Sequence, residues 1–92
     1  MSDPTPSQSS RVVVYSTDWC GFCDAAKRLL DERGIAFEEV DIGDDPAFRQ
    51  RMFDLAGQWT VPLVVVDDRP LGGFRELLQL ARSGRLDELV AA

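Results

Sequence analysis

Two short stretches of this 92-residue chain, Val12–Tyr15 and Leu63–Val66, contain only aliphatic or aromatic side chains. Successive side chains of a strand point to opposite faces of the sheet, so strands of this composition need apolar cover on both faces. We therefore expect both stretches to be strands of a sheet that carries helices on each side. Leu63–Val66 is the more apolar of the two and is expected at the centre of the sheet.

Three other segments carry apolar residues three or four positions apart, which is the spacing of one face of an amphipathic helix. These apolar residues are Phe22, Ala26, Leu29 and Leu30 in the first segment, Phe48, Met52, Leu55 and Ala56 in the second, and Phe74, Leu77, Leu78 and Ala81 in the third. Gly34, Gly57 and Gly84 follow these segments, and glycine can end a helix in the left-handed conformation. Residues 85–90 predict a last short helix.

The segments between these helices predict two further strands. Residues 35–42 form one of them, but their apolar side chains change phase in mid-segment, which indicates a bulge or an edge position. Asp44 or Asp45 then precedes a proline and is expected to cap the second helix. Residues 67–70 turn the chain into a short return strand near Leu71. The order β-α-β-α-β-β-α predicts an α/β sandwich in which helices cover a small sheet.

The charge of the chain excludes several classes of function. Lys and Arg number 10 against 16 Asp and Glu, which gives a net charge of −6 without any His. Nucleic acids and anionic membranes are bound by cationic surfaces, so we expect neither as a partner. Two Cys without His cannot complete a four-ligand structural zinc site, and no resident metal is expected.

The first ten residues differ from the rest because they are rich in Ser and Pro. We expect a flexible N-terminal tail at residues 1–10 and a single domain over residues 11–92. No apolar run reaches the roughly 18–20 residues that span a bilayer, and the tail lacks the cationic start and apolar middle of a secretory signal. A cytoplasmic protein without membrane contact is therefore expected.

Cys20 and Cys23 lie where the first predicted strand gives way to the first helix. In a reducing compartment, such a close pair indicates redox chemistry or metal binding rather than a structural cross-link. Free N–H groups at a helix start favour a thiolate, and Cys20 lies nearest to them. We expect Cys20 to be the nucleophile and Cys23 the resolving thiol. The residues alone also allow an inert buried pair, or a metal site completed by another subunit or a bound thiol.

Together with two later motifs, this dithiol resembles the glutaredoxins, a thioredoxin-like family. The matching stretches are Tyr15–Cys23, Thr60-Val61-Pro62 and Gly72-Gly73, in family order and at family-like separations, within residues 11–84. The resemblance implies a thioredoxin-like three-layer sandwich with a four-stranded mixed sheet covered by helices on both faces. It also implies that Cys20 is the attacking thiol and that the chain is a thiol–disulfide oxidoreductase.

The resemblance further implies a groove that binds the tripeptide glutathione as co-substrate. Pro62 is expected in cis, facing the dithiol, although residue types alone favour a trans proline at a strand start. The outward-facing N–H and C=O of Val61 would pair with an extended thiol peptide. Arg49, at the matching position of the second helix, is expected near one glutathione carboxylate, unless it is only a solvated surface charge.

The second glutathione carboxylate is expected at the start of the third helix. There Gly72 and Gly73 would let the chain approach the ligand, and the N–H groups of Phe74 and Arg75 would hold the carboxylate, unless the glycines form only an ordinary turn. Four further residues complete the expected site: Thr17, Trp19, Phe22 and Thr60. Trp19 is expected to shield the nucleophile and Phe22 to lie half in the core. Trp59 is expected to pack at the rim or to form a platform for the ligand.

The chain departs from the family pattern at four positions, which keeps other functions open. Thr17 stands where many members have Lys, Gly21 follows the first Cys in place of Pro, Trp59 replaces a basic residue, and Arg75 replaces a polar or acidic one. Cys-Gly-Phe-Cys is one residue from the Cys-Gly-Phe-Ser of the cluster-carrying monothiol branch. A second hypothesis is therefore a dimer in which two Cys20 thiolates and two glutathione thiols hold a [2Fe–2S] cluster.

The same four departures are compatible with a redoxin whose reductant is another low-molecular-weight thiol, as in mycoredoxins, or thioredoxin reductase. A non-catalytic interaction domain that uses the same groove is a further hypothesis. The leading hypothesis is a monomeric, glutathione-dependent oxidoreductase. It would reduce protein disulfides and glutathione mixed disulfides, so its expected partners are glutathione or a similar thiol and disulfide-containing or glutathionylated proteins.

Overall fold

The computed structural model describes residues 12–43 and 45–91, and the predicted tail at residues 1–10 lies outside the described residues. The elements follow one another as β1 (Val12–Ser16), α1 (Gly21–Glu32), β2 (Glu38–Asp41), α2 (Pro46–Ala56), β3 (Leu63–Val66), β4 (Arg69–Gly72), α3 (Phe74–Ser83) and α4 (Arg85–Ala91). The order predicted from the sequence, with its last short helix, is confirmed.

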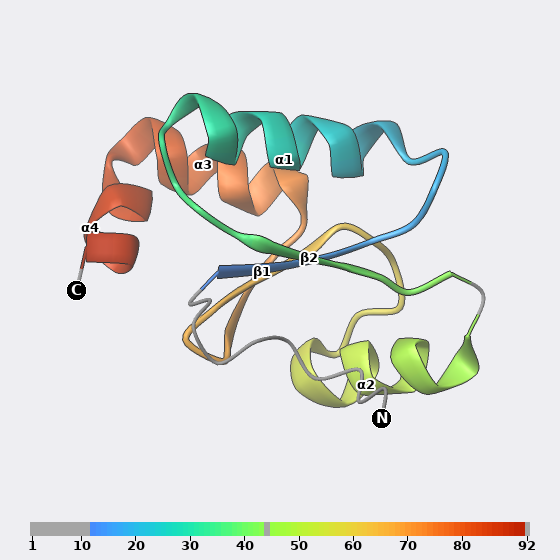
Figure 1. Ribbon diagram of the computed structural model, residues 1–92. Helices are drawn as coiled ribbons and strands as arrows, with labels where there is room; N and C mark the ends of the chain where they lie inside the picture. The colour runs from blue at the N-terminus through green and yellow to red at the C-terminus, as the bar shows by residue number, and fades with distance from the viewer. Residues whose placement is uncertain (1–11, 44, 92) are drawn as a thin grey trace.

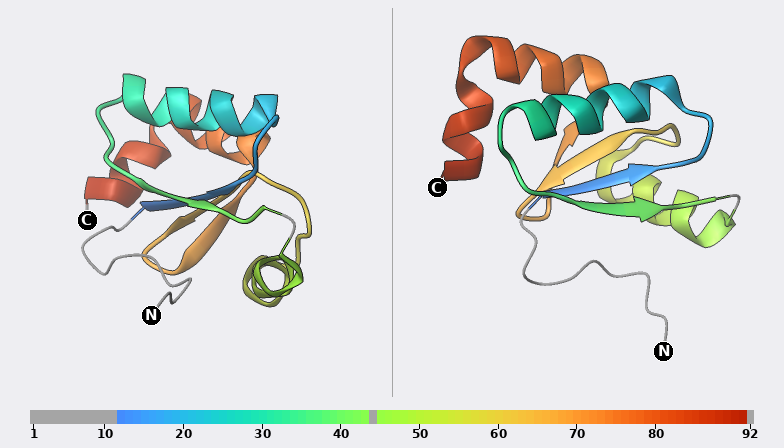
Figure 2. Two further views of the ribbon diagram at one scale, coloured as in Figure 1. Left: turned by 45° about the vertical axis from the view of Figure 1, so that its right-hand side comes forward. Right: turned by 45° about the horizontal axis from the view of Figure 1, so that its top comes forward.

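The strands form one mixed sheet in the order β2-β1-β3-β4. β1 pairs with β2 in parallel and with β3 antiparallel, and β4 pairs antiparallel with β3. β1 and β3 are therefore the interior strands, which confirms the central position expected for Leu63–Val66. Helices α1 and α3 lie side by side over one face of the sheet, and α2 covers the other (Figures 1 and 2). The predicted three-layer sandwich is confirmed.

The alternation of side chains along β1 and β3 divides the apolar interior into two clusters. Val12, Val14, Val64 and Val66 pack with residues of α1, α3 and α4, including Ala26, Leu30, Leu77, Ala81 and Leu86. Val13, Tyr15, Leu63 and Val65 pack on the opposite face with Met52 of α2 and with Ile42. Both interior strands are thus buried on both faces, because each cluster takes every second residue.

The second predicted strand is shorter than expected, since β2 covers only Glu38–Asp41 of residues 35–42. The N–H of Ile35 still bonds the carbonyl of Leu30 at 2.9 Å, so the chain there is leaving α1 rather than pairing with the sheet. Ile35 packs against the cluster on the α1 side, whereas Val40 packs on the α2 side. The change of phase therefore marks a strand start, and the predicted edge position is confirmed.

The capping residues explain where the helices begin and end. Asp45 caps α2 by accepting the N–H of Ala47 at 2.9 Å, as the sequence predicted. Gly57 and Gly84 end α2 and α3 with φ of 69° and 82°, which confirms the left-handed ends expected from the sequence. None of the helices in residues 12–43 and 45–91 combines the length and apolar character needed to cross a membrane.

Candidate active site

Cys20 forms the N-cap of α1, at the junction between the β1 loop and the helix. Its backbone is extended, with φ −116° and ψ 105°, and its Sγ accepts the N–H of Cys23 at 3.1 Å. The sulfur thus takes the place of the oxygen that usually satisfies a free N–H at a helix start. The helix end carries a partial positive charge, and this sulfur lies directly beside it. Cys20 is half-buried and remains reachable from solvent.

Cys23 lies on the inner side of the same turn and is fully buried. Burial, and after it the hydrogen bond to the Cys20 sulfur, raise the pKa of its thiol to about 12, while the backbone of Thr17 and the charge of Lys27 act in the opposite direction. Cys23 therefore stays protonated at neutral pH. The two thiols differ in environment: one is reachable at a helix end, and the other is a buried proton donor.

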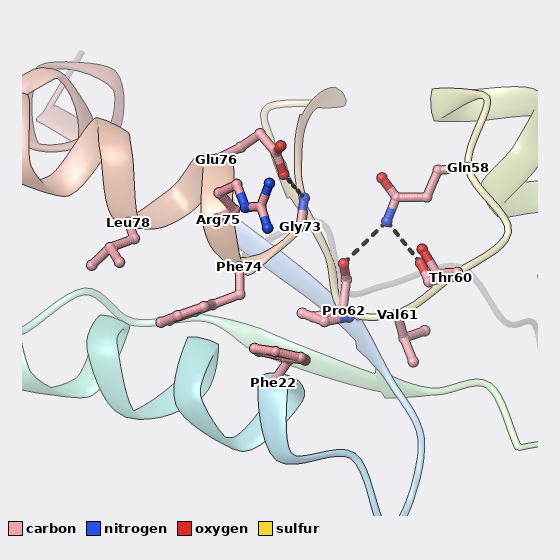
Figure 3. A pocket seen from close by; sticks show the side chains of 10 residues that line it. All are labelled: Phe22, Gln58, Thr60, Val61, Pro62, Gly73, Phe74, Arg75, Glu76 and Leu78. Carbon is pink, nitrogen blue, oxygen red and sulfur yellow. Dashed lines mark hydrogen bonds between the residues drawn. The ribbon is translucent and has the colours of Figure 1, made fainter.

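A groove of about 470 Å³ lies beside the first turn of α1, which is large enough for a small peptide (Figure 3). Its lining combines the α1 start, the segment before β3 and the α3 start, through Phe22, Gln58, Thr60, Val61, Pro62, Gly73, Phe74, Arg75, Glu76 and Leu78. Seven of these residues were expected at the site from the sequence, and the fold brings them together. Gln58, Glu76 and Leu78 were missed.

Phe22 has an environment different from the one predicted. It is 67 % exposed, although the helical pattern placed it on the buried face of α1. The first turn of α1 lies beside the α3 start, where the Phe22 ring faces Phe74 at a centroid distance of 6.1 Å (Figure 3). The prediction that Phe22 lies half in the core is wrong, because its ring lines the groove opposite Phe74 instead of packing in the interior.

The segment before β3 presents backbone groups to the groove. The Val61–Pro62 peptide bond is cis, as the resemblance implied. In the part of the chain that the structure describes, no hydrogen bond involves the N–H or C=O of Val61. The side chain of Gln58 instead donates to the carbonyls on either side, those of Thr60 and Pro62. No periodic or capping pattern in the sequence indicates such a contact for Gln58.

The start of α3 is shaped by Glu76, whose Oε1 accepts the N–H of Gly73 at 2.8 Å (Figure 3). Gly72 has a φ of 113°, and a Cβ at this position would lie 2.9 Å from the Glu76 Cγ. Gly72 is thus the glycine that the conformation requires, whereas a Cβ on Gly73 meets only ordinary contacts. A Glu three residues after a helix cap is a known capping pattern, so the sequence held a signal for Glu76.

Three of the residues expected to bind the ligand do not line the groove: Thr17, Trp19 and Arg49. Thr17 approaches the dithiol through its backbone, beside Cys23. Trp19 has a φ of 61° and is fully exposed, so its ring packs on none of the described residues. Arg49 donates through Nη1 to the carbonyl of Trp59 at 3.1 Å. Trp59 itself does not line the groove.

The ring of Trp59 stacks on Phe53 at a centroid distance of 4.5 Å. Of the two roles expected for Trp59, rim packing is therefore the one that the structure favours.

A charged cluster lies behind the dithiol and joins β1, β2 and α1. Glu39 Oε2 accepts from the buried hydroxyl of Ser16 at 2.5 Å and from Lys27 Nζ at 2.8 Å. Lys27 also pairs with Asp24 at 3.5 Å. These hydrogen bonds lower the pKa of Glu39 and raise that of Lys27. The cluster fixes the end of β1 against α1, next to the turn that carries both thiols.

Within residues 12–43 and 45–91, no three His, Cys, Asp or Glu side chains gather as metal ligands. In the hypothesis of a [2Fe–2S] cluster, the iron ligands come from two subunits and two small thiols. A single chain therefore leaves that hypothesis untested, and it stays a prediction.

Comparison with known proteins agrees with this geometry. The glutaredoxin family model matches residues 12–71. A glutaredoxin of Pseudomonas aeruginosa is 38 % identical, with 88 % of this chain and 96 % of the relative covered. Glutaredoxin 3 of Escherichia coli is 35 % identical, with 88 % and 98 % covered. The buckwheat glutaredoxin–glutathione complex superposes with a TM-score of 0.83 at 28 % identity, with 90 % of this chain and 78 % of that one covered. This chain therefore belongs to the glutaredoxin family of thiol–disulfide oxidoreductases.

Proposed function

We propose that the chain is a glutathione-dependent oxidoreductase that works through Cys20 and Cys23. The observation that carries this proposal is the contrast between the two sulfurs. Cys20 is reachable and accepts an N–H at the helix start, whereas burial keeps Cys23 protonated beside it. A thiolate is the reactive form in thiol–disulfide exchange, so Cys20 is the attacking group and Cys23 the resolving one.

Glutathione mixed disulfides would be reduced by Cys20 alone. The Cys20 thiolate attacks the glutathione sulfur, so that the Cys20–glutathione disulfide forms and the protein thiolate leaves and takes up a proton. A second glutathione thiolate then attacks the bound glutathione sulfur. Oxidised glutathione leaves, and the Cys20 thiolate is restored.

Protein disulfides would require both thiols. The Cys20 thiolate attacks one sulfur of the substrate and forms an intermolecular disulfide, while the other substrate sulfur leaves as a thiolate. Cys23 then loses its proton and attacks the Cys20 sulfur, which releases the reduced substrate and leaves a Cys20–Cys23 disulfide. Two glutathione molecules return the two electrons and become oxidised glutathione.

The groove beside the dithiol supports glutathione as the small thiol. Val61 offers a peptide backbone an N–H and a C=O that no described residue bonds, in the manner of an added strand. Phe74 and Arg75 lie at the start of α3, where their N–H groups have no partner within the helix, and Arg75 adds a positive charge for a carboxylate. The similar buckwheat protein forms a complex with glutathione. We place the reaction in one chain and in the reducing cytoplasm, which keeps both thiols reduced.

Serine variants of the two thiols test the proposal. Both variants would be assayed on a glutathionylated peptide and on a peptide with an internal disulfide. We expect Cys20→Ser to fall to background on both substrates. Cys23→Ser should keep activity on the glutathionylated peptide and lose it on the internal disulfide, and thus serves as the matched control. Retained activity in Cys20→Ser would refute the assignment of the nucleophile.

The electron donor is tested separately with the unmodified protein. Glutathione, another low-molecular-weight thiol, and thioredoxin reductase with its reductant would each be supplied as the sole donor. We expect turnover of the glutathionylated peptide with glutathione. Turnover with either other donor and none with glutathione would leave the oxidoreductase activity in place and reject glutathione dependence.

A further inference from the structure

The segment that borders the groove, residues 59–62, is held by side chains rather than by strand pairing. Gln58 Nε2 donates to the carbonyl of Thr60 at 2.7 Å and to that of Pro62 at 3.1 Å. Arg49 Nη1 donates to the carbonyl of Trp59 at 3.1 Å. Within the described residues, the carbonyl of Val61 is the one in this segment that accepts no hydrogen bond. We call Gln58 and Arg49 the carbonyl clamp.

The contacts of Gln58 require its amide in particular. Both partners are carbonyl oxygens, which only accept, so the nitrogen must face them and both of its hydrogens are used. Figure 3 shows the amide nitrogen directed at the two carbonyls, from a residue that itself lines the groove. Gln58 is half-buried, and its hydrogen bond to the Pro62 carbonyl is partly shielded from water, whereas the bond to the Thr60 carbonyl is exposed.

We propose that Gln58 is a positioning residue for substrate binding, with Arg49 as the second member of the clamp. By fixing the carbonyls on both sides of Val61, Gln58 holds the Val61 N–H and C=O in the orientation that an extended thiol peptide needs. This inference rests on the proposed function, because it supplies the preorganisation of the groove for that substrate. It also gives Arg49 a role in supporting the segment, and the remaining N–H groups of its guanidinium stay available for the ligand contact expected from the sequence.

The clamp has a kinetic signature that differs from the effect of losing the nucleophile. The Val61 backbone would contact the peptide both before and during the exchange reaction. Interactions made equally in the bound substrate and in the transition state affect KM and leave kcat unchanged. Loss of two hydrogen bonds that order the segment should raise KM about tenfold.

The test compares Gln58→Met, which keeps the length of the side chain and removes both donors, with Gln50→Met. Gln50 is the matched control because its Nε2 also donates one hydrogen bond, to Asp54 Oδ1 at 2.9 Å, but on the exposed side of α2. Steady-state kinetics on a glutathionylated peptide would be measured beside the rate at which iodoacetamide alkylates Cys20. We expect Gln58→Met to raise KM about tenfold, with kcat and the alkylation rate unchanged. Gln50→Met should match the unmodified protein.

An unchanged KM in folded Gln58→Met overturns the proposal, as does an equal loss of kcat and of alkylation rate, which would indicate general damage to the site. If Gln58→Met does not fold, Gln58→Glu answers the same question, because its carboxylate is isosteric and cannot donate at neutral pH.

Failure of the proposed function can be distinguished from failure of the clamp proposal, because it is seen in the unmodified protein. The unmodified protein would then not turn over the glutathionylated peptide. The clamp would still be measured as a change of KM on the peptide with an internal disulfide, with another low-molecular-weight thiol or thioredoxin reductase as the electron donor.

Discussion

At the scale of single residues, the active site depends on two cysteines that belong to one helical turn and behave differently. The sulfur of Cys20 is at the cap, where N–H groups face it, whereas Cys23 points into the protein beneath the same turn. The different behaviour of the two thiols arises from the burial of Cys23, since both residues are cysteines. In the proposed reaction, it would direct the first attack to the more accessible sulfur of Cys20 and keep a proton on Cys23 until the resolving step.

The raised pKa of Cys23 predicts a loss of stability at high pH. Its folded-state pKa of about 12 lies above the ordinary value of 9.0, so the folded protein holds this proton more tightly than the unfolded chain. The stabilisation is complete below the ordinary value and is lost as the pH rises through 12. Urea unfolding of the reduced protein should show this loss across the alkaline range.

Cys23→Ala is the control for this experiment, because it removes the titrating group and keeps Cys20. The difference in unfolding free energy between the unmodified protein and Cys23→Ala should shrink as the pH rises. Parallel pH profiles for the two proteins would show that Cys23 is not the group responsible.

At the scale of elements, the start of α3 combines a backbone turn and a side-chain cap. Gly72 has a positive φ and lies against the Glu76 side chain, which in turn holds the N–H of Gly73. The turn at Gly72 therefore brings the start of α3 to the groove. The Glu76 side chain satisfies one free N–H at this helix start, that of Gly73. The N–H groups of the next two residues, Phe74 and Arg75, have no partner within the helix.

Replacement of Gly72 by Ala should destabilise the protein by about 2 kcal/mol, because φ is unfavourable for Ala and the added Cβ would lie 2.9 Å from the Glu76 Cγ. Gly21→Ala is the matched control. Gly21 lies in α1 with no atom within 4 Å of the position that its Cβ would take. The free energy of unfolding of Gly21→Ala should rise by about 0.5 kcal/mol. Thermal or urea unfolding of both variants measures the difference, and equal effects would contradict the strain assigned to Gly72.

At the scale of the whole molecule, the site lies at one end of the two interior strands, which pack against an apolar cluster on each face of the sheet. β1 ends at the loop that carries the dithiol, and β3 begins directly after the Val61–Pro62 segment. Because these strands pair with each other, the dithiol loop and the groove segment are brought to one end of the sheet. Both strands are buried on both faces, so the distance between the two parts of the site is fixed by the core.

The last helix is part of this core, although it follows the residues that match the family model. Leu86 of α4 is fully buried among residues of β1, α1 and α3. Leu86→Ala should therefore lower the unfolding free energy by about 3 kcal/mol in a single cooperative transition. Leu89→Ala, at a half-buried position of the same helix, should lower the unfolding free energy by less. Equal losses, or a separate early transition for α4, would show that α4 is not integrated into the domain.

The sequence alone predicted the elements and their order well, because these depend on local signals. Apolar runs identified β1 and β3, helical spacing identified α1, α2 and α3, and glycines at their ends predicted where α2 and α3 stop. The position of Cys20 at a helix start followed from the same signals. The resemblance carried by three motifs added the cis bond before Pro62 and most of the groove lining.

Contacts between distant segments were decided only by the tertiary structure. Phe22 fits the apolar face of its helix, yet it faces the groove because the first turn of α1 lies beside the α3 start. Arg49 and Gln58 bond carbonyls of an irregular segment, and such contacts leave no periodic trace in a sequence. The burial that raises the pKa of Cys23 also depends on the packing of the whole domain. Local periodicity thus determined which elements form, while packing determined which side chains and backbone groups the site presents.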